Sequence, residues 1–225
     1  PHYRGDFPVL KTATELNLKI HLVSSKQSLS ELITSKPFAS RLGVLIDFGI
    51  IVDQDVIDSF PLGIVNSHFS LLPAWRGADP ISFAILAGDK KTGVSLMLIE
   101  KALDTGKILT QKSLPIGLND TTPMLTKKLI DLSNNMLIEY LPKYIAGSAT
   151  PRSQPHPDRA THSRKLTKQD GVMDWSKPAE VLEREIRAFV EWPKSTTTIG
   201  NKEVIVTKAS IAKQTGIPGF AEVQD

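Results

Sequence analysis

Short apolar segments alternate with helix-like segments over the first two thirds of the chain, and this alternation constrains the fold more than any other feature of the sequence. Apolar runs at 44–46, 63–66 and 94–99 have the composition of buried strands. Residues 79–88 and 122–140 have the residues and spacing of helices. Strands that alternate with helices predict an α/β fold with a mostly parallel sheet.

Both predicted helices have start signals. Asp79-Pro80 is typical of an N-cap followed by proline at the first helical position, and Gly88 indicates the end of that helix. Thr122-Pro123 opens the second helix. Its apolar residues recur at spacings of 4, 3, 4 and 4 along one face, which are Leu125, Leu129, Leu132, Met136 and Tyr140.

Proline and charge content change near residue 141. Residues 142–157 contain four prolines, which are not expected to continue a helix or to lie inside a sheet. Residues 141–168 carry six basic residues and one acidic residue. We interpret this region as a linker, which is either a solvated connector or a strap that contacts phosphates.

The sequence after the linker predicts a helix followed by a β-hairpin. Ser176-Lys177-Pro178 begins the helix and Trp192-Pro193 ends it, with one apolar side formed by Val181, Leu182, Ile186 and Phe189. Gly200-Asn201 lies between two strand-like runs and predicts the turn. We therefore expect a domain over 1–147, a basic linker over 148–163 and the start of a small β domain over 164–225.

Composition excludes several classes of protein. The chain has no cysteine, which excludes a disulfide scaffold, a thiolate zinc site and a cysteine nucleophile and fits a reducing compartment. Its five histidines are scattered, so no metal site is expected. No apolar run approaches the roughly 18 residues that span a bilayer. A formal net charge of +3 is too small to identify a nucleic-acid partner by itself. We expect a cytoplasmic monomer, with an organellar location left open.

Three short motifs mislead. Arg4-Gly5-Asp6 matches an integrin-binding tripeptide in a chain without secretory features. Asp47-Phe48-Gly49 matches the magnesium triplet of kinases, but the other kinase motifs are missing. Asp104-Thr105-Gly106 occurs once, whereas an aspartic protease needs two carboxylates that share a proton.

The residue types that suit chemistry are Asn66, His68 and Asp104. Asn66 and His68 are two residues apart at the end of a predicted strand, so both side chains are expected on one side of the sheet. A carboxamide can hold an oxyanion, an imidazole can stabilise it or move a proton, and a carboxylate can orient the imidazole or accept a proton. These groups suit acyl transfer to an amine. Each residue also has a purely structural explanation. Asn66 can end the strand, His68 can be a hydrogen-bonded structural histidine, and Asp104 can belong to an Asx turn.

The block around these residues resembles a known family. Residues 66–81 read Asn-Ser-His-Phe-Ser-Leu-Leu-Pro-Ala-Trp-Arg-Gly-Ala-Asp-Pro-Ile, and Thr92-Gly93-Val94 and Leu103-Asp104-Thr105-Gly106 follow. This pattern resembles the formyltransferases that use 10-formyltetrahydrofolate, and the Trp-Arg-Gly continuation resembles the members that formylate methionine on initiator tRNA. Asp174-Trp175-Ser176 and the segment 186–193 look like the opening of the C-terminal domain of those members.

The resemblance implies a Rossmann-like catalytic domain, followed by part of an OB-like β-barrel that helps to hold tRNA. It implies formyl transfer from 10-formyltetrahydrofolate to the α-amine of methionyl initiator tRNA, without a metal. The implied catalytic residues are Asn66, His68 and Asp104. The implied cofactor-binding residues are Asp47, Phe48, Gly49, Ile50, Ser70, Leu71, Leu72 and Pro73. The implied tRNA-binding residues are Arg4, Arg76, Arg152, Arg164 and Lys165.

The sequence departs from the family pattern at Asp47, Phe69 and Ala74, where relatives commonly have alanine, glycine and arginine. The family also begins with a β-α-β unit before the position of Pro1, so we expect a fragment that lacks this unit and the last barrel strands. Two alternatives stay open. One is another enzyme that uses the same formyl donor, either a hydrolase or a sugar-amine formyltransferase. The other is an RNA-binding fragment with impaired catalysis.

Overall fold

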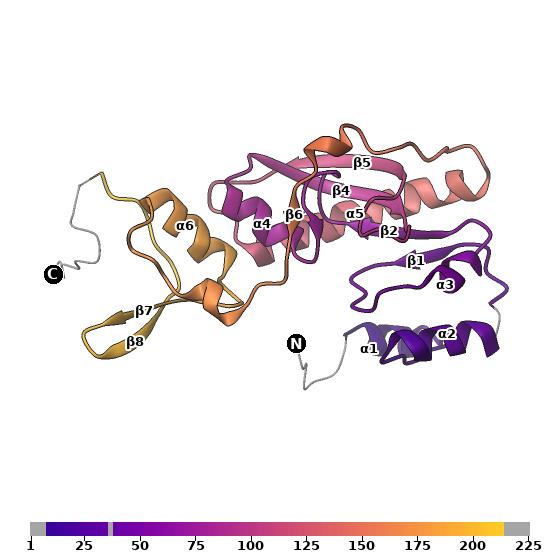
Figure 1. Ribbon diagram of the computed structural model, residues 1–225, viewed down its shortest axis with the longest axis horizontal. Coiled ribbons are helices and arrows are strands. Elements are labelled where there is room, and N and C mark those ends of the chain that lie inside the picture. Colours follow the sequence, from indigo (N-terminus) through magenta and orange to yellow (C-terminus); the bar gives the residue numbers. More distant parts are fainter. Residues whose placement is uncertain (1–7, 36–37, 214–225) are drawn as a thin grey trace.

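The computed structural model describes residues 8–35 and 38–213 (Figure 1). The helices are α1 Pro8–Glu15, α2 Lys26–Ser35, α3 Gln54–Asp58, α4 Pro80–Ala87, α5 Thr122–Ile145 and α6 Ala179–Ala188, with short 3-10 helices η1 Pro157–Arg159 and η2 Lys168–Gly171. The strands are β1 Gly43–Leu45, β2 Ile64–His68, β3 Arg76–Gly77, β4 Lys91–Leu98, β5 Ile108–Pro115, β6 His162–Ser163, β7 Ser195–Ile199 and β8 Lys202–Val206. No helix in these ranges is long and apolar enough to cross a bilayer.

Four strands form the central sheet in the order β1-β2-β4-β5. The predicted α/β class is confirmed, and β1 pairs with β2 in parallel as expected. The pairings of β2 with β4 and of β4 with β5 are antiparallel, which differs from the mostly parallel sheet predicted. The reason is that α4 lies beyond one end of the sheet (Figure 1), so the chain enters β4 at the end where it left β2. A hairpin-like connection then reverses the chain into β5.

The two faces of β2 have different roles. Val65 and Ser67 face α5, since Val65 belongs to the main core and the Ser67 hydroxyl lies 2.7 Å from that of Ser133 in α5. Successive side chains of a strand point to opposite faces, so Asn66 and His68 face the side of the sheet away from α5. The face opposite α5 is therefore the one that carries the predicted catalytic side chains.

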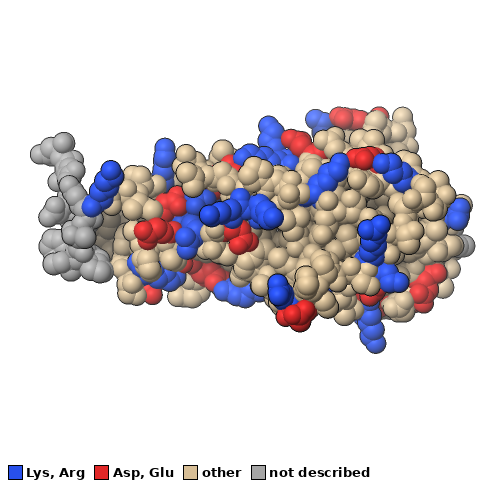
Figure 2. All heavy atoms as spheres, turned by 90° about the horizontal axis from the view of Figure 1, so that it is seen from above, with Lys and Arg blue, Asp and Glu red and all other residues tan. Residues whose placement is uncertain are grey.

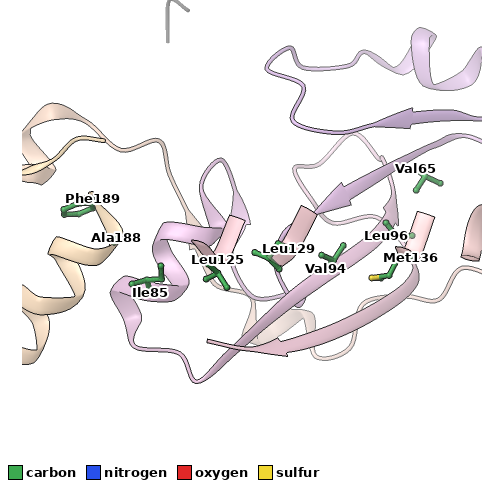
Figure 3. Close-up of a cluster of buried hydrophobic side chains, with 9 residues drawn as sticks. All are labelled: Val65, Ile85, Val94, Leu96, Leu125, Leu129, Met136, Ala188 and Phe189. Carbon is green, nitrogen blue, oxygen red and sulfur yellow. The ribbon is translucent and has the colours of Figure 1, made fainter. Parts of the chain in front are cut away.

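The main core lies between the sheet, α4, α5 and α6 (Figure 3). Its buried side chains come from all four of these parts, and they are Val65, Ile85, Val94, Leu96, Leu125, Leu129, Met136, Ala188 and Phe189. Polar contacts reinforce the docking of α6. The Arg184 guanidinium donates to the Leu86 carbonyl at 3.0 Å, and the Thr122 hydroxyl donates to the Ala188 carbonyl at 2.8 Å. Residues 188 and 189 thus complete the core that the sheet begins.

The predicted helix ends are partly right. Asp79 caps α4 through the Ser82 amide, and Gly88 ends it with φ +75°, both as predicted. The prediction that a helix cannot continue at Pro142 is wrong, since α5 runs to Ile145. Pro142 lies in the last turn of α5, and the Tyr144 hydroxyl holds that turn to the segment just before β2 by donating to the Leu62 carbonyl at 2.8 Å. Tertiary contacts therefore outweigh the lost backbone bond.

The β1 segment is less buried than predicted. Val44 and Ile46 keep 47% and 46% of their surface exposed. Among the described strands, β1 is an edge that pairs only with β2. Only one of the two edges of β1 is paired with another of these strands. The other edge is not covered by any of them, which accounts for the greater exposure of Val44 and Ile46. The strand β5 was not predicted, and its four central residues, Thr110 to Ser113, are all polar, so it lacks the apolar run that marked the other strands.

The linker is not a solvated connector along its whole length. The backbone of Arg152 pairs with that of Ile108 in both directions, at 2.7 and 2.8 Å. Farther on, β6 pairs in parallel with β3. In Figure 1 this segment runs from the end of α5 across the sheet and down to β6. The predicted β-hairpin is confirmed, with β7 and β8 joined through a turn in which Gly200 has φ +60°.

Asp120 at the start of α5 provides a test of stability. Burial raises the pKa of this carboxyl, but hydrogen bonds from Lys128 and the Gly117 amide, each at 2.7 Å, outweigh burial and leave the pKa below its ordinary value. We expect Asp120→Asn to lower the free energy of unfolding by about 1–2 kcal/mol at pH 7. A lowered folded-state pKa means that this contribution is complete above about pH 4 and is lost as the pH falls through the folded pKa.

Urea unfolding at pH 7 and in acid measures this effect. The control is Asp131→Asn, which makes the same chemical change at an exposed position of α5. An Asp120→Asn penalty of the same size in acid as at pH 7 would contradict the electrostatic explanation.

Candidate active site

His68 and Asp104 meet on the face of the sheet opposite α5. His68 is the last residue of β2, and Asp104 lies in the turn between β4 and β5. The His68 Nδ1 atom is 3.7 Å from the Asp104 Oδ2 atom, and the two side chains are only 7% and 10% exposed. The structure thus brings together an imidazole and a carboxylate that are far apart in the sequence.

The second ring nitrogen of His68 has a backbone partner. His68 Nε2 lies 2.9 Å from the Trp75 carbonyl oxygen. A carbonyl only accepts hydrogen bonds, so this nitrogen donates its proton to Trp75 and the Nδ1 atom is the one that faces Asp104. The Trp75 carbonyl therefore fixes which edge of the imidazole is turned toward the carboxylate.

Local backbone geometry fixes the Asp104 carboxylate. Its Oδ2 atom accepts a hydrogen bond from the Gly77 amide at 2.7 Å. Asp104 itself has φ +52°, in the left-handed region that aspartate tolerates better than most residues. A Cβ atom at Gly106 would lie 1.8 Å from the Leu98 carbonyl oxygen, so only glycine allows the turn to pack against the end of β4. The backbone geometry of the turn therefore explains why aspartate and glycine occupy the first and last positions of the Asp-Thr-Gly pattern.

Asn66 is on the same face of β2 as His68 and is half-buried. Its direct neighbours across the sheet are Leu45 on β1 and Met97 on β4. The parallel register of β1 places the loop that follows Leu45 beside Asn66. This loop holds the predicted cofactor-binding residues Asp47, Phe48, Gly49 and Ile50, of which the first three are exposed.

The loop after His68 is held from inside. The Ser70 hydroxyl donates to the Ala74 carbonyl at 2.5 Å, and the Leu72 backbone bonds both the Ser95 hydroxyl and the Gln111 amide, at 3.1 and 2.9 Å. Four of the predicted cofactor-binding residues lie in this loop. Two of them, Ser70 and Leu72, have fully buried side chains and shape the loop from inside. Leu71 and Pro73 are half-buried.

The predicted tRNA-binding residues have different positions. Arg4 lies outside the described residues. Arg152 and Lys165 are exposed, and Arg164 is exposed but paired with Asp170. On the face shown in Figure 2, Lys and Arg side chains are interspersed with Asp and Glu. Arg152, Arg164 and Lys165 are therefore exposed at the surface, and their binding of tRNA stays a prediction.

Arg76 is less accessible than a tRNA-binding role suggests. It was expected to contact tRNA, but it is only 9% exposed, and its guanidinium donates to the Gln154 side-chain oxygen at 2.7 Å. The pairing of β3 with β6 covers this side chain. Burial limits the contact of this cation with an external phosphate, and binding of tRNA by Arg76 stays a prediction.

Sequence reasoning missed three groups that surround the pair: the Trp75 carbonyl, the Gly77 amide and the Gln154 side chain. Two are backbone groups, which no residue type signals. For the Gly77 amide the sequence does give one signal, which is the glycine itself. A Cβ atom at this position would lie 2.1 Å from the Ser163 carbonyl oxygen, so the close approach requires glycine. Within the described ranges, no group of three or more His, Asp and Glu side chains is arranged to hold a metal ion.

Comparisons with known proteins identify relatives of this chain. Methionyl-tRNA formyltransferase of Roseiflexus castenholzii (strain DSM 13941 / HLO8) is 40% identical over 202 residues, which cover 88% of this chain and 64% of that protein. The enzyme of the same name from Halorhodospira halophila (strain DSM 244 / SL1) is 38% identical over 202 residues, covering 90% and 64%. The chain therefore spans slightly less than two thirds of the length of these relatives.

Solved structures share the fold. HypX from Aquifex aeolicus in complex with tetrahydrofolic acid matches with a TM-score of 0.73 at 17% identity, over 92% of this chain and 36% of that one. A sugar N-formyltransferase from Shewanella sp FDAARGOS_354 matches with a TM-score of 0.70 at 18% identity, over 90% and 81%. These similarities show the Rossmann-like fold of formyltransferases.

Two family models match the sequence directly. The model described as formyl transferase matches residues 8–141, and the model described as formyl transferase, C-terminal domain, matches residues 165–225. The first match spans more than half of the chain and contains Asn66, His68 and Asp104. The chain belongs to the formyl transferase family.

Proposed function

We propose that this protein transfers the formyl group of 10-formyltetrahydrofolate to the α-amino group of methionyl initiator tRNA, as an enzyme of translation initiation. The observation that carries the proposal is the buried approach of His68 to Asp104, with Asn66 on the same sheet face. The names of relatives that are 36–40% identical support the choice of acceptor. The Trp75-Arg76-Gly77 segment supports the assignment of the pair, because it carries the backbone groups that hold both His68 and Asp104.

The chemistry follows from these groups. The neutral amine attacks the formyl carbon, a carbon–nitrogen bond forms, and the carbonyl oxygen gains negative charge in a tetrahedral intermediate. The Asn66 amide can donate a hydrogen bond to that oxyanion, and the His68 ring can stabilise the same charge or move a proton. The attacking nitrogen must lose a proton, and the carboxylate of Asp104 is the base that we assign to it. Breaking the bond between the formyl carbon and the folate nitrogen, which then takes up a proton, completes the transfer.

The residues expected to hold the folate fit a flat, partly polar ring. The loop after β1 starts beside Asn66 and exposes the Phe48 side chain at 39% of its surface. Leu71 and Pro73 are half-buried on the loop that follows His68. An exposed loop next to half-buried apolar side chains offers backbone hydrogen bonds together with apolar contact, which suits a pterin.

We further propose a monomer that acts in the cytoplasm and contacts the tRNA backbone through Arg152 and Lys165. Both are exposed basic residues, and Arg152 lies on the segment that crosses the sheet. We keep the proposed division into a domain over 1–147, a linker over 148–163 and a second domain over 164–225.

An acceptor comparison tests the function. The whole protein is incubated with 10-formyltetrahydrofolate labelled in its formyl group and with charged initiator tRNA, with a nucleotide-linked amino sugar, or with buffer alone. We expect label on methionyl-tRNA at a rate at least about 100-fold above the other two reactions, because discrimination between acceptors depends on how well each one is bound in the transition state.

Each other outcome identifies a rival function. Label on the sugar would indicate a sugar-amine formyltransferase, and release of formate in buffer at the same rate would indicate a hydrolase. Salt-sensitive tRNA binding without any transfer would indicate an RNA-binding protein, because phosphate contacts weaken as salt rises.

A further inference from the structure

Gln154 connects the linker to the turn that holds Asp104. It lies between α5 and β6 and is only 8% exposed. Its side-chain nitrogen donates to the Asp104 carbonyl at 2.7 Å and to the Gly106 carbonyl at 3.0 Å. Its side-chain oxygen accepts from the Arg76 guanidinium at 2.7 Å. One buried side chain thus joins three segments of the chain.

These partners require an amide. The Arg76 guanidinium only donates hydrogen bonds, and the two backbone carbonyls only accept them. A neutral side chain between them must therefore offer an acceptor on one side and donors on the other, which a carboxamide does. The same partners fix the orientation of the Gln154 amide, because the reverse orientation would place its oxygen against both carbonyls.

The turn that Gln154 holds has little freedom to adopt another conformation. Asp104 has a positive φ, and Gly106 packs directly against the Leu98 carbonyl. Gln154 bonds the carbonyls on both sides of Thr105, while the Gly77 amide bonds the Asp104 carboxylate. Arg76 and Gly77 are neighbours in β3. The contact between Gln154 and Arg76 therefore also fixes the Gly77 amide, which donates to the Asp104 carboxylate.

We propose that Gln154 is a positioning residue for catalysis, which fixes the Asp104 carboxylate relative to the Gly77 amide and the His68 ring. This inference rests on the proposed function, since it assigns Gln154 to the same reaction. Nothing in the local sequence of the linker points to this role. It follows from three hydrogen bonds made by one buried amide.

Gln154→Glu is the sharpest variant. It keeps the size of the side chain and the contact with Arg76, but it turns the donating end into a carboxylate that faces two carbonyls. We expect kcat for formyl transfer to fall by about 10- to 100-fold, because misplacing a catalytic group by about 1 Å has effects of that size. KM for 10-formyltetrahydrofolate is expected to change less than about threefold, since the buried Gln154 side chain has its hydrogen bonds directed to Arg76 and to the turn.

The matched control is Gln169→Glu, the same change at an exposed position of η2, which should leave kcat unaltered. Gln154→Met provides a second test without added charge, in case the buried glutamate prevents folding. Gln154→Met should also lower kcat with an unaltered circular dichroism spectrum. A wild-type kcat in a folded Gln154→Met protein would overturn the proposal.

Hydrogen exchange gives a readout that does not depend on the reaction. We expect the Gly77 amide to exchange at least about tenfold faster in Gln154→Met than in the wild type, with the β4 amides unchanged, because the bond from Gly77 to Asp104 loosens. If Gly77 keeps its protection, the positioning role is wrong even where the wild type transfers formyl groups. If Gly77 loses protection but the wild type transfers no formyl group to any acceptor, the proposed function is wrong and the structural role of Gln154 stands.

Discussion

Replacing Asp104 by asparagine is expected to lower kcat for formyl transfer by about 10²- to 10⁴-fold, the range that a general acid–base group contributes. Asparagine keeps the shape of the side chain and can still accept the hydrogen bond from the Gly77 amide, which is 2.7 Å long in the wild type. It also tolerates the positive φ of this position. The variant therefore removes the negative charge beside His68 without removing the contact that shapes the turn.

Steady-state kinetics and thermal unfolding of the purified variant measure both halves of this expectation. Asp131→Asn, at an exposed site of α5, serves as the control for the chemical change. His68→Ala is expected to lower kcat by a similar factor. Near-wild-type turnover in either folded variant would falsify the assignment of the pair.

Truncation of Phe189 is expected to have the largest effect on stability. Phe189 is 3% exposed and belongs to the main core with Ile85 of α4 and Leu125 of α5 (Figure 3). Phe189→Ala leaves a cavity between these helices, so we expect the free energy of unfolding to fall by about 3–5 kcal/mol. Denaturant unfolding followed by circular dichroism measures the loss.

The control for Phe189→Ala is Ile138→Ala in α5, which removes apolar atoms from a side chain that is 77% exposed. That change is expected to alter stability by less than about 0.5 kcal/mol. A loss below about 1 kcal/mol for Phe189→Ala would mean that α6 unfolds separately from the sheet and its helices.

Local rules predicted the elements whose signals are local. The caps of α4 at Asp79 and Gly88 and the hairpin turn at Gly200 each depend on residues within a few positions, and each prediction is confirmed. The path of α5 through Pro142 was not predictable in this way, because the Tyr144 contact that holds the last turn reaches back to Leu62. The antiparallel entry into β4 likewise depends on where α4 packs.

The candidate site shows the same division. His68 and Asp104 were predicted from their residue types and their family pattern, and they lie 3.7 Å apart. Arg76 was predicted from the family resemblance to bind tRNA, although it is only 9% exposed and lies where β3 pairs with β6. Its partner Gln154 is 78 residues away in the sequence. Contacts of that separation leave no local pattern, which is why sequence reasoning missed them.

The place of Phe189 in the main core also concerns how the protein is made. The helix that ends at Ile145 and the strands before it bury their apolar faces fully only when Ala188 and Phe189 are present. On a ribosome, the 44 residues from 146 to 189 must be synthesised in between. At about 5–20 residues per second this takes roughly 2–9 s. During that interval the nascent chain keeps an apolar surface uncovered, which makes it a client for chaperones that bind such surfaces.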